Sequence, residues 1–385
     1  MIKNINDGVY AMVEYEKMSE AAKKIRGFFT GKPDAGIVQT EFGYYCLDKW
    51  KSQGHITDET NLSELFMCED TGVTGIRGLG MCEAAFSPYF TEEVLEDRGE
   101  YELVRDIVGR HVLYFKGRRK GFMPEYVDHP VKDMKSWEEN CKWRMNPNSP
   151  ERYENLGKNM QSTVKRVNEG CVVQQYVVGG YMYLRSLIGP EGLLYKFYDE
   201  PELIHDCMKA WLELADRVTA EHQKYVTVEE LLLDEDVCYK TGSLISPDMI
   251  REFLLPYYQQ LISNIKSRQP DKSRHLFIHL ATDGFVYPVI DVYKEIGMDY
   301  MSPFEVASGC DVVEVGKKYP GLLIRGGIDK RILASGREAI DREIDRIMPA
   351  MKKRGGYIPT CDHGVPEEVD FHDYLYYRKR MQDFK

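Results

Sequence analysis

The sequence lacks several features that would assign it quickly to a class. No apolar run approaches the roughly 20 residues of a membrane-spanning helix, and the first residues lack the apolar core of a signal peptide. The nine cysteines are odd in number, widely spaced and contain no CxxC pair, which argues against a disulfide framework and a structural zinc finger. There is no block of lysine and arginine, and 51 basic against 62 acidic residues give a net charge of −11. We therefore expect a cytoplasmic protein without nucleic-acid or membrane partners.

The composition that remains is that of an ordinary globular chain. Of 385 residues, 43% are hydrophobic and 29% are charged, which suffices for a sizeable core. We expect a single domain over residues 1–385, with residues 1–160 as an irregular N-terminal elaboration. Within it the pattern predicts a helix over 8–30, a short buried strand over 35–40, a β-hairpin over 101–117 and a polar surface excursion over 119–160.

From about residue 170 strands and helices alternate regularly, which predicts parallel βαβ units. Several predicted strands end in polar residues, and in a (β/α)₈ TIM barrel such ends meet on one rim. A doubly wound open sheet is the rival fold, but the glycine-rich phosphate loop that usually follows its first strand is absent. The barrel is therefore favoured. The predicted strands cover 172–178, 231–233, 275–282, 299–302, 322–325 and 356–360, and the helices 201–225, 246–268, 286–296, 336–353 and 367–383.

Two groups of residues could form a metal site. In Cys361-Asp362-His363 a thiol and an imidazole, both good zinc ligands, lie two residues apart at a predicted strand end. Taken alone, the tripeptide is explained better by a loop histidine beside a buried cysteine. His279 and Asp283 share one face of their strand, with His279 deeper, and could complete the site. A core histidine and a helix-capping aspartate explain that pair equally well.

Carboxylates and one arginine are the other candidates. In the triplet Asp234-Glu235-Asp236, alternation sends Glu235 to one side and its neighbours to the other. Crowded carboxylates raise at least one pKa, which suits proton transfer, although a solvated strand end is the simpler explanation of the triplet. We select Asp236, Glu235 and Glu305 as candidate catalytic residues. Arg185 could clamp a substrate carboxylate, or form a structural ion pair, and Tyr181 is the other candidate substrate-binding residue.

Together these segments resemble the uroporphyrinogen decarboxylase superfamily, best from about residue 170 onward. The carrying motifs are Arg185-Ser186-Leu187-Ile188-Gly189, the stretch 236–247, Pro256-Tyr257-Tyr258, Asp283-Gly284, Ser302-Pro303-Phe304-Glu305, Gly326-Gly327-Ile328-Asp329 and His363-Gly364-Val365-Pro366. The resemblance implies a (β/α)₈ barrel with its site at the carboxyl ends of the strands. It also implies a homodimer as the assembly to expect.

The superfamily contains two chemistries. Its decarboxylases act on the acetate arms of uroporphyrinogen and carry an arginine-rich N-terminal motif, whereas the corresponding segment here reads Ile37-Val38-Gln39-Thr40-Glu41-Phe42-Gly43-Tyr44. Its other branch comprises zinc-dependent methyltransferases that work with a corrinoid protein, and this branch is the closer one. Their zinc motif is a His-x-Cys pair and a later Cys. Alignment on Asp283-Gly284 places Ala281 and Asp283 at the pair and Cys361 or His363 at the later position.

The resemblance leads to a first functional hypothesis. An aspartate ligand makes zinc a harder Lewis acid, which suits an O- or N-methyl donor better than the thiol of coenzyme M. We therefore expect a methyltransferase that moves a methyl group from a small O- or N-methylated substrate to a separate corrinoid protein. Zinc would be held among His279, Asp283, Cys361 and His363. The alternatives are a cofactor-free decarboxylase of a tetrapyrrole or small acid, and a non-catalytic binder of a tetrapyrrole or corrinoid.

Overall fold

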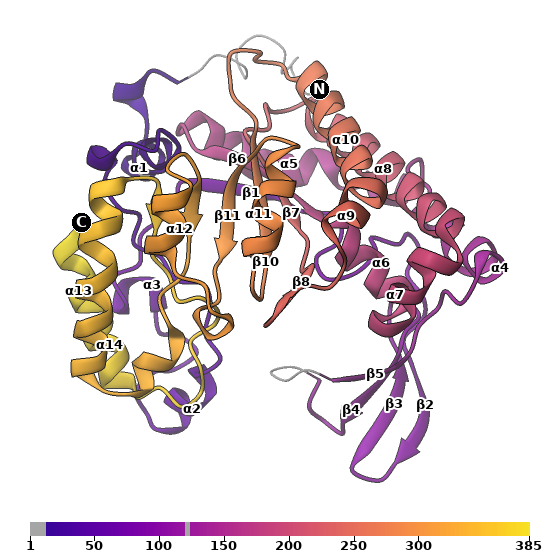
Figure 1. The fold of residues 1–385 in the computed structure, drawn as a ribbon, viewed down its shortest axis with the longest axis horizontal. Helices are drawn as coiled ribbons and strands as arrows, with labels where there is room; N and C mark the ends of the chain where they lie inside the picture. The colour runs from indigo at the N-terminus through magenta and orange to yellow at the C-terminus, as the bar shows by residue number, and fades with distance from the viewer. Residues whose placement is uncertain (1–12, 120–123) are drawn as a thin grey trace.

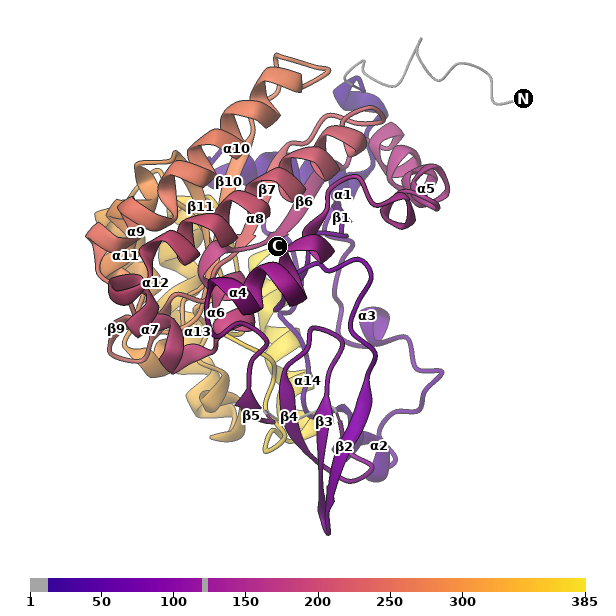
Figure 2. The same cartoon turned by 90° about the vertical axis from the view of Figure 1, so that its right-hand side faces the viewer.

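The architecture of the chain is a curved parallel sheet wrapped by helices, with a second, smaller sheet at one end (Figures 1 and 2). A computed structural model describes residues 13–119 and 124–385. Its seven parallel strands are hydrogen-bonded in the order β1-β6-β7-β10-β11-β12-β13. These strands are β1 Val73–Ile76, β6 Val172–Val178, β7 Glu230–Asp234, β10 Phe277–Thr282, β11 Met298–Pro303, β12 Leu323–Arg325 and β13 Tyr357–Ile358.

Helices cover the outer face of this sheet (Figure 1). They are α5 Leu156–Asn168, α6 Gly180–Ile188, α7 Pro190–Asp199, α8 Pro201–His222, α9 Pro247–Phe253, α10 Leu255–Arg268, α11 Tyr287–Lys294, α12 Val312–Lys318, α13 Arg337–Arg354 and α14 Phe371–Met381. Residues such as Leu231, Leu233 and Leu280 point into the core shared with these helices. The predicted alternation of strands and helices is thus confirmed, and the strand order is that of a TIM-barrel-like sheet.

Two predicted elements, the strand over 35–40 and the helix over 246–268, differ from the structure. The expected strand over 35–40 is buried at Ile37, Val38 and Gln39 but belongs to no sheet, so the described residues contain seven strands of the curved sheet where eight were expected. The helix expected over 246–268 divides at Leu254 into α9 and α10, although Ser246 caps its start as predicted by accepting a hydrogen bond from the Met249 amide.

The N-terminal third also contains regular structure. The predicted helix over 8–30 is α1, Glu20–Phe29, and its first five positions lie outside the described residues. Two short helices follow, α2 Leu47–Ser52 and α3 Leu62–Leu65. Ile25 and Phe28 of α1 pack against Val172 and Tyr300 of the sheet. This helix therefore covers the amino-terminal end of the sheet.

The predicted hairpin is confirmed and is part of a larger sheet that projects from the body (Figure 2). Its four antiparallel strands are β2 Glu93–Arg98, β3 Tyr101–Arg105, β4 His111–Phe115 and β5 Glu125–Asp128. The segment 119–160 is more than a surface excursion. It supplies β5 and the short helix α4, Met134–Ser136, and it buries Trp137, Cys141 and Met145 in the main core.

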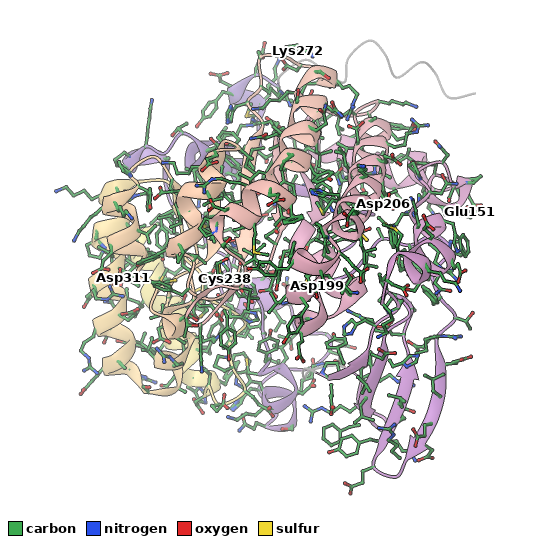
Figure 3. The ribbon with its side chains drawn as sticks, turned by 45° about the vertical axis from the view of Figure 1, so that its right-hand side comes forward. Glu151, Asp199, Asp206, Cys238, Lys272 and Asp311 are labelled. Atoms are coloured by element: carbon green, nitrogen blue, oxygen red, sulfur yellow. The ribbon has the colours of Figure 1, made fainter. Side chains whose placement is uncertain are left out.

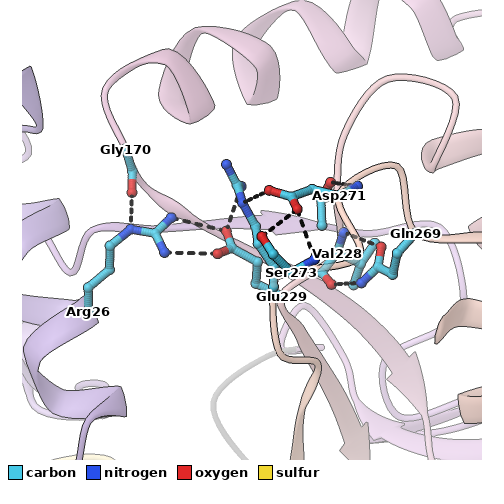
Figure 4. Close-up of polar contacts among 9 residues, drawn as sticks. Arg26, Gly170, Val228, Glu229, Gln269, Asp271 and Ser273 are labelled. Carbon is cyan, nitrogen blue, oxygen red and sulfur yellow. Dashed lines mark hydrogen bonds and ion pairs between the residues drawn. The ribbon is translucent and has the colours of Figure 1, made fainter. Parts of the chain in front are cut away.

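A polar network joins α1 to the amino-terminal ends of β6 and β7 (Figure 4). The Arg26 guanidinium donates to the Gly170 carbonyl at 2.7 Å and to the buried carboxylate of Glu229 at 2.8 Å. Arg274 also pairs with Glu229. Because this end of the sheet is closed by α1 and the network, the opposite end is the one left available for ligands.

Candidate functional site

Polar side chains gather where β7, β10, β11, β12 and β13 end. We call six of them the carboxyl-end cluster: Asp234, Asp236, Asp283, Glu305, Lys330 and His363. The loops that carry them lie on the side of the molecule toward which β8, Cys238–Tyr239, extends in Figure 1. Figure 3 shows side chains crowded around Cys238, which is buried. The gathering expected from the polar strand ends is therefore present.

The triplet Asp234-Glu235-Asp236 begins at the last residue of β7, and its side chains point alternately as predicted. Asp234 accepts a short hydrogen bond from the Tyr176 hydroxyl, and the Arg77 guanidinium lies 4.2 Å from the centre of the Tyr176 ring. Burial raises the pKa of Asp234, and Asp236 raises it further. Asp236 turns back into the cluster with a left-handed backbone, φ +44°, and its carboxylate pairs with Arg185 at 2.6 Å. Arg185 therefore forms an ion pair with a cluster carboxylate.

Glu235 points away from the cluster into the core. One carboxylate oxygen accepts from the Tyr181 amide at 3.0 Å and the other from the Tyr258 hydroxyl. Burial raises its pKa to about 7. A Cβ on Gly179 would lie 2.3 Å from this carboxylate, so glycine is required there. Glu235 thus anchors the start of α6, and Tyr181 contributes its backbone amide while its ring is fully buried.

Asp283 is the most perturbed carboxyl group of the cluster. Burial, together with repulsion from Asp236, Glu305 and Asp234, raises its pKa to about 7. Its Oδ2 lies 3.7 Å from Nε2 of His363. Because its pKa lies near neutrality, Asp283 can both hold and release a proton there.

Glu305 and Lys330 form the second ion pair of the cluster. The Lys330 ammonium lies 3.5 Å from Glu305 Oε1, and Glu305 Oε2 accepts from the Gly284 amide at 3.0 Å. Like Arg185, Lys330 is thus engaged with an acidic group. The cluster as a whole offers carboxylates more readily than cations to a ligand.

Two buried carboxylates outside the cluster hold its loops together. Asp362 accepts from the Val306 amide at 2.8 Å and from the Lys330 amide at 3.1 Å, so one side chain ties three strand-end loops. Glu41 accepts from the Cys361 amide at 2.8 Å and from the Tyr374 hydroxyl at 3.1 Å. The N-terminal segment is thereby fastened to the loop that carries His363.

The four residues expected to bind zinc do not come together. His279 lies deeper than Asp283, as predicted, but its Nδ1 contacts Glu230 at 2.7 Å and its Nε2 contacts Ser302 at 2.8 Å. Cys361 is fully buried beside Glu41. Only Asp283 and His363 are neighbours. Within residues 13–119 and 124–385 no three His, Cys, Asp or Glu side chains are arranged to hold a metal ion, so the expected ligand set does not fit zinc.

Several residues of the site were not selected from the sequence. Asp234 belongs to the acidic triplet, and Lys330 directly follows the Gly326-Gly327-Ile328-Asp329 motif. Their position at the ends of strands is the feature of the sequence that could have identified them. Tyr176, Arg77 and Tyr45 contact the site through side chains that no local pattern marks. These contacts depend on the three-dimensional fold.

Comparison with known proteins identifies the family. Residues 118–378, well over half of the chain, match the uroporphyrinogen decarboxylase (URO-D) family, and the chain belongs to it. This membership confirms the resemblance carried by the sequence motifs. The superfamily includes decarboxylases and methyltransferases.

The individual relatives are distant. A uroporphyrinogen decarboxylase of Pseudomonas syringae is 23% identical over 57% of this chain and 62% of its own length, and one of Legionella pneumophila is 22% identical over 33% and 34%. The chain thus spans about a third to three fifths of the curated relatives that it matches. A methyltransferase from Methanosarcina mazei superposes with a TM-score of 0.58 over 94% of this chain and 99% of its own, at 12% identity. This likeness supports the fold.

No helix in the described part of the chain is long and apolar enough to cross a membrane.

Proposed function

We propose that the protein is a methyltransferase that takes a methyl group from a small O- or N-methylated donor and passes it to a corrinoid held by a separate protein. The observation that carries this proposal is the Asp283 carboxyl group, whose pKa is raised to about 7, beside Nε2 of His363. Breaking a methyl–oxygen bond leaves the bonding electron pair on the leaving oxygen, which then takes a proton. Asp283 is placed to supply it.

The charge of the cluster supports methyl transfer over decarboxylation of uroporphyrinogen. A substrate with many carboxylates needs free cations, whereas Arg185 and Lys330 are paired with Asp236 and Glu305. The segment Thr40-Glu41-Phe42-Gly43-Tyr44 offers no arginine either. Decarboxylation of a tetrapyrrole or small acid remains the second candidate, favoured by the curated relatives.

Each residue has a specific task in this proposal. The methyl carbon leaves the donor without its bonding electrons and forms its new bond with an electron pair of the acceptor, which the partner protein supplies. Asp283 gives its proton to the leaving atom, and His363 donates a hydrogen bond to the same atom. Burial, with repulsion from Asp236 and Glu305, raises the pKa of Asp283 to about 7, so part of the carboxyl group still carries its proton near neutral pH. The proposed steps need no zinc, and the four expected ligands do not lie together.

Methylation of reduced free cobalamin tests the proposal. The purified chain would be mixed with methoxyaromatic compounds, methanol, methylamines and betaines in turn, and methylcobalamin formation would be followed by absorbance. We expect turnover with at least one donor and its loss in Asp283→Asn, with Asp248→Asn, an exposed carboxylate on α9, as the control. Carbon dioxide release from uroporphyrinogen, without methyl transfer from any donor, would establish the decarboxylase instead.

A further inference from the structure

The imidazole of His363 has an unusual set of partners on its Nδ1 atom. The Gly364 amide donates a hydrogen bond to Nδ1 at 2.8 Å. A backbone amide can only donate, so Nδ1 must present its lone pair. The Tyr45 hydroxyl lies 3.1 Å from the same nitrogen, where it can donate to the one lone pair that the Gly364 amide also uses. In the neutral ring the proton must then be on Nε2, which is the nitrogen that faces Asp283.

We propose that Phe42 and Tyr45 are positioning residues that, with Gly364, hold His363 as the neutral Nε2–H tautomer. The two side chains come from one N-terminal loop, and both contact the ring. The centre of the Phe42 ring lies 4.8 Å from the centre of the imidazole. The Tyr45 ring stacks on the imidazole, with 5.7 Å between the ring centres and 24° between the planes. Contacts with these rings fix the orientation of the imidazole as well as its tautomer.

The backbone of this loop is hydrogen-bonded to the segment that follows His363. The Tyr45 amide donates to the Val365 carbonyl and the Val365 amide donates to the Gly43 carbonyl, both at 2.9 Å. A Cβ on Gly364 would lie 2.7 Å from the Tyr45 ring, so glycine lets the ring approach. Phe42 and Tyr45 nonetheless remain 40% and 56% exposed. Burial alone therefore does not explain why two large rings lie here, whereas contact with the imidazole does.

The tautomer has a chemical consequence for the site. With its proton on Nε2, the ring is a neutral hydrogen-bond donor at the edge of the carboxyl-end cluster. A neutral histidine that binds a metal through Nε2 must instead carry its proton on Nδ1, where it would meet the Gly364 amide. The same contacts thus favour a role as donor to a leaving atom and disfavour metal ligation. This consequence for catalysis rests on the proposed function, whereas the tautomer itself does not.

Nitrogen-15 NMR of the full chain with labelled histidine tests the inference directly. The chain has nine histidines, and His363→Gln assigns the signal. We expect a pyrrole-type shift for Nε2 and a pyridine-type shift for Nδ1 at pH 7.5. In Phe42→Ala/Tyr45→Ala the two shifts should move toward the averaged values of a free imidazole. A pyrrole-type Nδ1, or averaged shifts already in the wild type, would overturn the proposal.

The Tyr45 hydroxyl can be tested separately from its ring. Tyr45→Phe keeps the stacking but removes one donor. Tyr239→Phe is its control because Tyr239 is equally exposed, at 56%, and its ring lies under the Lys240 ammonium. We expect a shift of the His363 nitrogens in Tyr45→Phe alone. With an active methyl donor, kcat should fall about tenfold in Tyr45→Phe at unchanged KM. Unchanged His363 shifts in both variants of Tyr45 would refute its positioning role. The expected shifts without turnover of any donor would support the inference and refute the proposed function.

Discussion

Asp283 Oδ2 lies 3.7 Å from Nε2 of His363, although 80 residues separate the two in sequence. Asp283 follows β10 and His363 follows β13, so the curved sheet brings them to the same end. The pKa of the carboxyl group is raised to about 7 by burial and by neighbouring carboxylates, and burial lowers the pKa of the histidine. At neutral pH the pair therefore combines a carboxyl group that can still carry a proton with an uncharged imidazole.

The rate of methyl transfer should depend on the protonated form of Asp283. We expect kcat to fall as the pH rises through about 7, because the acid form is lost there. Asp283→Asn should lower kcat by about 10²- to 10³-fold and remove this limb of the profile. A pH–rate series with saturating donor measures both. A profile that rises through neutral pH would show that the carboxylate form is needed, and Asp283 would then not be the acid.

Glu235 should make the stability of the protein depend on pH. Its pKa is about 7 in the folded protein and about 4.5 when exposed, so the folded state binds the proton more tightly. This contribution to stability is fully present below about pH 4.5 and is lost as the pH rises through 7. The difference corresponds to about 3 kcal/mol. Urea unfolding at several pH values should show this decline in the wild type and a flatter curve in Glu235→Gln. If stability declined equally with pH in the wild type and in Glu235→Gln, Glu235 would not be the group responsible.

Glu235 and Asp236 also illustrate what the sequence can reveal about the site. The two side chains face opposite sides, as predicted, but both residues follow β7, which ends at Asp234, and Asp236 reaches the cluster through its left-handed backbone. The polar residues at the strand ends correctly predict where the cluster forms. The pattern does not say which side is the core. That depends on Tyr258 of α10, which reaches Glu235 from outside the strand.

The same limit explains why the ligand set could not be predicted. His279 and Cys361 have the right chemistry for zinc, and His279 lies on β10 while Cys361 follows β13. Their partners are Glu230, Ser302 and Glu41, which come from three other segments. Local spacing contains no information about such long-range contacts. The periodicity of hydrophobic residues is a local property, so it predicted the helices and strands well.

Asp362 should be essential for the arrangement of the strand-end loops. Asp362→Ala would leave the Val306 and Lys330 amides without their acceptor in a fully buried place, at a cost of about 2–4 kcal/mol. Asp362→Asn keeps one acceptor oxygen, so it should lose less stability. Chemical unfolding of the two variants beside the wild type measures the order. Equal stability of all three proteins would show that Asp362 does not tie the loops.

His279 and Cys361 should act in folding and not in metal binding. His279 bridges the buried carboxylate of Glu230 and the Ser302 hydroxyl. His279→Ala removes one hydrogen bond from Glu230, which keeps the one from Gln174 at 2.8 Å, and should cost about 1–3 kcal/mol. Zinc content of tag-free protein, before and after zinc reconstitution, provides the complementary measurement. We expect well below one zinc per chain in the wild type and no decrease in Cys361→Ala, His363→Ala or Asp283→Ala. One zinc per chain that is lost in these variants would mean that the loops rearrange around a metal, and the zinc-assisted mechanism would then replace proton donation by Asp283.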